Sequence, residues 1–282
     1  MALSIGTNIS ALDAAAALFS LGRNIETSME RLSTGKRINS ASDDAAGVGI
    51  SSRLSAEIRG TNQAIRNTLD AQALIDTAEG AHKEVENILQ RMREIGVQAM
   101  NDTNSTQDRA NLDTEFVALK TEIDRVASVT AWAGQVLMDT GDSTFSFQVG
   151  GRTGDENQVN VTIKSMRTAD IGGDAAGLRV NMARTRTLGE AEASITIIDD
   201  ALKDVNTQRS ELGAVSNGLN HTINNLTNMS TNLSAAVGGI EDADFAIETT
   251  KLAKNQILQR AATAMLAQAN ASKQSVLTLL RT

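Results

Sequence analysis

The 282-residue sequence predicts a mainly α-helical protein, in which long antiparallel helices form a coiled-coil or bundle rod with a small β-hairpin in the middle of the chain. First, apolar residues recur at steps of three and four over most of the length, which is the spacing of a helix–helix seam. Second, proline, which interrupts helices, is absent, and aromatic residues make up only 2%. Third, apolar and polar residues alternate in two short central stretches, as they do in strands.

Each end of the chain predicts one helix. The N-terminal stripe consists of Ile5, Ile9, Leu12, Ala16 and Phe19, continued by Leu18, Leu21, Ile25, Met29 and Leu32. Gly35, Lys36 and Arg37 are typical of a helix C-terminus. The C-terminal stripe consists of Leu258, Ala262, Met265, Ala269, Ser272, Val276 and Leu279, with Leu280 beside it. Both stripes are thin and rich in alanine, so we expect the two helices to pair and other copies of the chain to cover what remains.

Three longer stripes predict the helices between the ends. One helix is expected to begin near Asp44, with the stripe Leu74, Ala78, Ala81, Val85, Ile88, Met92, Ile95 and Ala99. The next is capped by Ser105 or Thr106 and carries Leu112, Phe116, Leu119, Ile123 and Val126. The last is expected from a capping box of Thr187 and Glu190 to Gly238 and Gly239. Its stripe includes Ile198, Leu202, Val205, Arg209, Leu212, Leu219 and Leu226.

Between these helices the period changes from that of a helix to that of a strand. Phe145, Phe147 and Val149 alternate with polar residues, and so do Val159, Val161 and Ile163. A polar, glycine-containing stretch, RTGDEN, joins the two runs. The sequence therefore predicts a β-hairpin at about residues 143–166.

The residues that enzymes use are scarce, so we expect no catalytic site, no metal site and no cofactor. Cysteine is absent, and the two histidines, His82 and His221, are interpreted as helix-surface residues because no partner motif surrounds them. The pair Asp43–Asp44 is interpreted as a capped turn. A net charge of −8 argues against a general binder of nucleic acid or anionic membranes, and no apolar run is long enough for membrane insertion. The first residues also lack the positive charge of a cleaved secretory signal.

Several segments resemble bacterial flagellins. ERLSTGKRINSASDDAAG, residues 30–47, is similar to the N-terminal signature of that family, and QRMREIGVQAM is similar to its R-x-R-E-[LI]-x-V-Q segment. The stretch from ETTKLAKNQ to QSVLTLL is similar to the family's C-terminal end. One departure is Trp132-Ala133-Gly134, where the family usually has Phe-Asn-Gly.

The resemblance implies a structural subunit that polymerises into the secreted, extracellular flagellar filament for swimming motility. Its inner layer, D0, would be formed by residues 1–42 and 239–282, and the next layer, D1, by residues 43–238 with the hairpin. The D0 contacts between subunits are expected to involve Ile5, Ile9, Leu12, Phe19, Leu258, Met265, Val276, Leu279 and Leu280.

The implied partners are other copies of the chain, sister flagellins, the flagellar export apparatus with its flagellin chaperone, and the hook-associated and cap proteins. A host Toll-like receptor for flagellin is a further candidate, and the matching positions are Arg91, Ile95 and Glu115. Ile95 also belongs to a predicted core stripe, and Arg91 and Arg93 fit a solvated face as well. The alternatives are a flagellin-like hook–filament junction protein, a helical chemoreceptor-like signalling module and, least favoured, a hydrolase.

Overall fold

The computed structural model describes residues 7–172 and 188–279, with side chains described for residues 7–172 and 193–273. The chain divides into two compact units. Unit 1 consists of Met1–Ile58 and Thr231–Thr282, and unit 2 consists of Arg59–Ser230. Unit 1 thus draws on both ends of the chain. Within the described ranges no helix is both long and apolar enough to cross a membrane.

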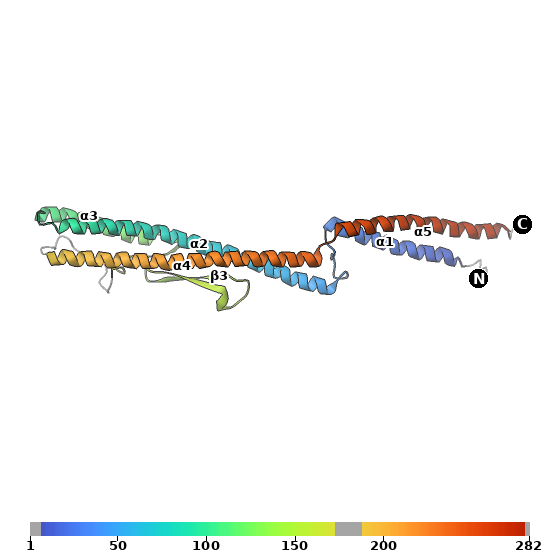
Figure 1. Cartoon of the computed structure of the whole chain (residues 1–282), viewed down its shortest axis with the longest axis horizontal. Helices are drawn as coiled ribbons and strands as arrows, with labels where there is room; N and C mark the ends of the chain where they lie inside the picture. Colours follow the sequence, from blue (N-terminus) through green and yellow to red (C-terminus); the bar gives the residue numbers. More distant parts are fainter. Residues whose placement is uncertain (1–6, 173–187, 280–282) are drawn as a thin grey trace. The chain divides into compact units, whose positions relative to one another are not determined.

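Unit 1 is built on two antiparallel helices, α1 (Ile9–Thr34) and α5 (Phe245–Leu279), which lie side by side (Figure 1). Asn8 Nδ2 donates to the carbonyl of Ala269 at 3.0 Å, and Ser28 Oγ donates to Glu248 Oε1 at 2.8 Å. The start of α1 therefore lies beside the later part of α5, and the end of α1 lies beside the start of α5. The expected pairing of the two terminal helices is observed.

Local capping explains where these helices begin and end. Asn8 accepts a hydrogen bond from the Ala11 amide at the start of α1, and Gly35 ends α1 with a left-handed φ of 72°. Asp244 accepts from the amides of Ala246 and Ile247 at the start of α5. The sequence prediction of a helix end at Gly35 is confirmed.

Helix α4 (Leu188–Glu241) continues past Gly238 and Gly239, so the predicted end at these glycines is wrong. A glycine within a helix costs only about 1 kcal/mol relative to alanine, which packing offsets easily. The actual end is fixed by Arg37, whose backbone amide bonds to the carbonyl of Glu241 and whose guanidinium bonds to the carbonyl of Ile240. These bonds satisfy carbonyls that a helix C-terminus leaves without partners. The predicted start at Thr187 and Glu190 lies outside the described side chains.

Unit 2 packs the greater part of α2 (Ala45–Ala99) and α4 with α3 (Thr106–Val129) around one hydrophobic core. Helix α4 runs antiparallel to α2, because Gln72 bonds to Asn220 and Arg93 pairs with Asp199. Members of all three predicted stripes have almost no exposed surface: Leu74, Ala78, Val85, Met92, Ile95, Phe116, Ile123, Ile198, Val205, Leu212 and Leu219. The predicted fold class of long antiparallel helices is confirmed.

The predicted starts of α2 and α3 are also confirmed. Asp44, the residue just before α2, accepts through Oδ1 from the amide of Gly47 in the first turn of the helix, at 2.8 Å. Ser105 and Asp108 form a complete capping box at the start of α3, in which each side chain bonds to the other's backbone amide. Such caps satisfy amides that the helix itself leaves free.

The β-hairpin of unit 2 consists of β3 (Ser143–Gln148) and β4 (Gln158–Ile163), joined through a short 3₁₀ turn, η1 (Asp155–Asn157). Phe145 lies opposite Val161, and Phe147 lies opposite Val159. Val161 and Ile163 are fully buried in the core, as the alternation predicts. This hairpin is confirmed.

A second, very short hairpin was not expected. Strands β1 (Ala131–Trp132) and β2 (Gln135–Val136) pair across a turn in which Ala133 and Gly134 have φ values of 48° and 84°. A two-residue hairpin turn with positive φ at both positions favours Asn-Gly, and the sequence has Ala-Gly there.

The interpretation of His82 as a surface residue is wrong, because its side chain is fully buried in the core of unit 2. Gln208 of α4 is fully buried as well. His221 is exposed on α4, as expected.

Candidate assembly interface

Helix α1 carries apolar residues on more than the side that contacts α5. Leu18, Leu21 and Ile25 are half-buried, whereas Ile9, Leu12 and Phe19 are exposed. The exposed fraction of Phe19 reaches 78% and that of Ile9 reaches 66%. Large apolar side chains that remain this exposed in several places on one surface are typical of an interaction site.

Helix α5 shows the same property. Leu258 and Met265 are both exposed, Met265 to 66%. The five side chains of the expected D0 contact set that the structure describes are therefore all exposed in the single chain. Of the other members, Ile5 and Leu280 lie outside the described residues, and the side chains of Val276 and Leu279 are not described.

Sequence reasoning missed part of this surface. Further exposed apolar side chains of unit 1 are Met29, Ile50, Phe245, Ile247 and Ile257. Met29 was assigned to the stripe that faces α5, and Ile257 lies one position before a stripe residue. Phe245 and Ile247 stand in the first turn of α5, well before the predicted stripe begins at Leu258, so the stripe does not include them.

A groove of about 570 Å³ lies on unit 1 between α1 and α5. Its lining residues are Ala15, Leu18, Phe19, Gly22, Arg23, Glu26 and Leu266. Small residues at positions 15 and 22 leave the space that larger ones would fill. The two helices thus leave a concave, largely apolar strip uncovered.

A polar clamp holds α1 and α5 together next to this surface. Glu248 is buried; it accepts from Ser28 Oγ at 2.8 Å and pairs with Lys251 Nζ at 3.1 Å. Burial acts to raise the pKa of Glu248, but the bonds from Ser28 and Lys251 outweigh it and hold the pKa below its usual value. A separate ion pair joins Lys36, just after α1, to Glu241 at the end of α4 at 2.7 Å, and this contact raises the pKa of Lys36 and lowers that of Glu241.

The candidate receptor residues Arg91, Ile95 and Glu115 lie in unit 2, and they differ in exposure. Arg91 and Glu115 are half-exposed and bond to each other, with Arg91 NH2 2.8 Å from Glu115 Oε1. Arg91 also pairs with Glu94 at 2.9 Å, and these carboxylates raise the pKa of Arg91. Ile95 has no exposed surface, because it belongs to the core stripe of α2. The role of Ile95 as an accessible apolar anchor is therefore wrong for this structure, and its alternative reading as a core residue is correct.

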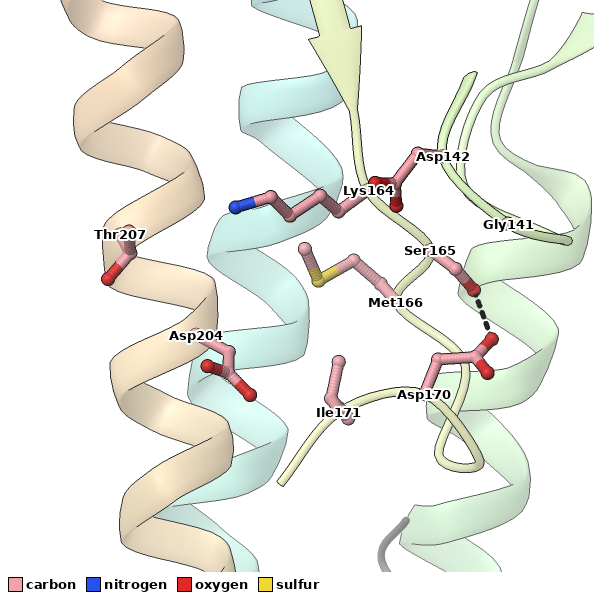
Figure 2. Close-up of a pocket in the computed structure, with 9 residues that line it drawn as sticks. All are labelled: Gly141, Asp142, Lys164, Ser165, Met166, Asp170, Ile171, Asp204 and Thr207. Atoms are coloured by element: carbon pink, nitrogen blue, oxygen red, sulfur yellow. Dashed lines mark hydrogen bonds between the residues drawn. The ribbon is translucent and has the colours of Figure 1, made fainter. Parts of the chain in front are cut away.

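Unit 2 also contains a polar pocket of about 330 Å³ between α4 and the segment that follows β4 (Figure 2). Ser165 Oγ bonds to Asp170 Oδ2 at 2.6 Å, and Asp204 of α4 accepts from the Gly172 amide at 3.1 Å. Lys164 lies 3.4 Å from Glu211 of α4. The contacts of Asp204 and Glu211 fasten the segment after the hairpin to α4, and the Ser165–Asp170 bond lies within the segment.

Comparisons with known proteins identify the family. Residues 5–142 match the bacterial flagellin N-terminal helical region, and residues 195–280 match the bacterial flagellin C-terminal helical region. The chain is 45% identical over 256 residues to a flagellin of Halalkalibacterium halodurans, covering 91% of this chain and 92% of that one. It is 38% identical to a flagellin of Bacillus subtilis, covering 99% of this chain and all of that one.

A solved structure, described as that of a putative flagellar hook-associated protein from Vibrio parahaemolyticus, is similar in fold. It covers 71% of this chain and all of its own, with a TM-score of 0.63 and 18% identity. At this identity the likeness concerns the fold alone, whereas the relatives above match closely over nearly the whole chain. The chain belongs to the bacterial flagellin family and is a subunit of the flagellar filament.

Proposed function

We propose that the chain polymerises by covering the exposed apolar faces of α1 and α5 with the same helices of neighbouring subunits. In this proposal the D0 layer consists of residues 1–42 and 239–282, which lie within unit 1, and the D1 layer consists of residues 43–238, which include all of unit 2. The observation that carries it is the exposure of Ile9, Leu12, Phe19, Leu258 and Met265 in the single chain. The tail residues Val276, Leu279 and Leu280 are proposed to continue the same contact.

The energetics favour such a contact. Covering a large apolar side chain contributes roughly 1.5–3 kcal/mol relative to leaving it in water. Several such side chains in each subunit, repeated at every contact of a polymer, outweigh the loss of rotational and translational freedom on association. The polar clamp around Glu248 then orients the two helices before they meet a neighbour.

The test is the pair Phe19→Asp and Phe19→Leu, compared by seeded polymerisation and sedimentation. A carboxylate at position 19 has to be desolvated in the proposed contact, so Phe19→Asp is expected to abolish sedimentable filaments. Phe19→Leu keeps an apolar side chain and is expected to polymerise. Because Phe19 is exposed, circular dichroism should show equal helix content in both variants. Normal filaments from Phe19→Asp would refute the proposal.

The family implies further partners, which we propose for this chain as well. Export through the flagellar apparatus with a flagellin chaperone would deliver subunits to the filament. Hook-associated and cap proteins would contact the subunits at its two ends. Sister flagellins would share the filament. Secretion of the chain in a strain that lacks the export apparatus would contradict this route.

Recognition by a host Toll-like receptor for flagellin is supported by the exposed pair Arg91 and Glu115, and Ile95 would act only by keeping α2 packed. Arg93, paired with Asp199, provides a matched control. In a receptor reporter assay with dissociated protein, Arg91→Ala and Glu115→Ala should lower the response, and Arg93→Ala should lower it less. A silent wild-type monomer, or equal responses from all variants, would refute this part.

A further inference from the structure

Two buried polar side chains lie at the same level of the core of unit 2. His82 follows Ala78 by four positions and precedes Val85 by three, so it occupies a core position of α2. Gln208 holds the equivalent position of α4, three after Val205 and four before Leu212. Arg209, the neighbour of Gln208, pairs with both Glu79 and Glu86 of α2, on either side of His82. We call these two residues the His82–Gln208 layer.

The hydrogen bonds of this layer leave two acceptors without a donor. His82 Nδ1 lies 2.6 Å from the Ala78 carbonyl oxygen. A carbonyl only accepts, so Nδ1 carries the proton and Nε2 presents a lone pair to the core. Gln208 donates through Nε2 to the Thr162 carbonyl of β4 at 2.9 Å. Neither His82 Nε2 nor Gln208 Oε1 has a hydrogen-bond partner among the described residues.

The charged groups around the layer are already paired. Glu79 and Glu86 of α2 both bind Arg209 of α4. On α3, the antiparallel register given by Arg91 and Glu115 places Asp124 near this level, and Asp124 accepts from the amide and hydroxyl of Thr168. Strand β4 has no charged residue between positions 158 and 163.

We propose that the His82–Gln208 layer makes the core of unit 2 acid-sensitive. Uptake of a proton at His82 Nε2 places a positive charge among Val85, Val205 and Leu212. This charge loosens the packing of α2 against α4 and against β4, the strand to which Gln208 is hydrogen-bonded. This property concerns the folding of unit 2 and does not depend on how the chain polymerises.

The sign of the effect follows from the burial of His82. Burial lowers the pKa of His82, reinforced by the charge of Arg209 and opposed by the Ala78 carbonyl and by Glu79. The unfolded chain titrates at a pKa of about 6.5. Stability is therefore fully present above about pH 6.5 and is lost as the pH falls through the lower pKa of the folded state. Each unit of difference between the two pKa values changes the folding equilibrium about tenfold.

The first measurement uses the wild-type chain. It contains only two histidines, and His221 on α4 is exposed. Nuclear magnetic resonance of the unpolymerised protein, titrated from pH 8 to 4.5, should give His82 a pKa below the ordinary histidine value of about 6.5. A His82 pKa at or above that value would overturn the proposal.

The second measurement compares the thermal unfolding of His82→Gln and His221→Gln between pH 7 and 5. The fluorescence of Trp132, the single tryptophan, reports on unit 2 because this side chain packs against its core. His221→Gln should keep the wild-type fall in unfolding temperature toward acid, and His82→Gln should show a smaller fall. Equal falls in both variants would count against the proposal. If His82→Gln does not fold, the titration of the wild-type chain decides.

Discussion

The pair Ile95→Ala and Val97→Ala tests the packing of α2 within unit 2. The two residues lie two positions apart on the same helix, but Ile95 has no exposed surface and Val97 is 52% exposed. Truncating a fully buried isoleucine to alanine costs about 2–5 kcal/mol, since it removes three carbons and leaves a cavity. Val97 loses two carbons that are half in water, which at about 0.8 kcal/mol per buried carbon amounts to about 0.8 kcal/mol.

Helix propensity slightly favours alanine at both positions, so it offsets part of each loss and does not alter the order. For a unit of this size, the unfolding temperature falls by about 2–4 °C per kcal/mol. Urea and thermal unfolding of the unpolymerised chain, followed by Trp132 fluorescence, should therefore show a large loss for Ile95→Ala and little change for Val97→Ala. Equal losses in the two variants would refute the assigned face of α2. The result also decides whether a weaker receptor response of an Ile95 variant reflects contact or unfolding.

Two further predictions concern backbone geometry. A Cβ atom added at Gly47 would lie 2.6 Å from both Asp44 Oδ2 and Ile38 Cδ1, whereas Gly49 faces open space. Gly47→Ala should therefore lower the thermal unfolding temperature of unit 1 measured by circular dichroism, and Gly49→Ala should raise stability by about 0.5–1 kcal/mol; the reverse order would contradict the packing of this turn. Ala133→Asn should stabilise unit 2 in urea unfolding, because asparagine avoids part of the roughly 1–2 kcal/mol that left-handed backbone costs an ordinary residue. A loss of stability in Ala133→Asn would mean that the turn differs from the one described.

Local signals in the sequence predicted the features that depend on neighbouring residues. Asp44, Ser105 and Gly35 act within one helical turn, so their residue types suffice to mark helix ends. The strand alternation likewise predicted the hairpin and its buried face, since one face must be buried. The end of α4 was missed because Arg37, more than 200 positions away, caps it.

In the core of unit 2, the spacing of apolar residues did not suffice to predict which of two adjacent residues is buried. Spacing alone allows Ala81 or His82 on the seam of α2, and Arg209 or Gln208 on that of α4. The predicted stripes contain Ala81 and Arg209, whereas the structure buries His82 and Gln208. His82 lies four positions after Ala78, and Gln208 lies three positions after Val205, so both also fit the spacing of a helix–helix seam. Which exposed side chains of α1 and α5 are covered depends on other subunits, and no pattern within one chain fixes that.

The central claim is that polymerisation covers the outer faces of α1 and α5. Hydrogen–deuterium exchange of the unpolymerised chain and of sedimented filaments, read peptide by peptide, tests it most directly. We expect peptides from α1 and α5 to gain strong protection in the filament, and peptides from the core stripes of α2, α3 and α4 in unit 2, already protected in the single chain, to gain much less. Filaments in which α1 and α5 exchange as fast as they do in the unpolymerised chain would contradict the claim.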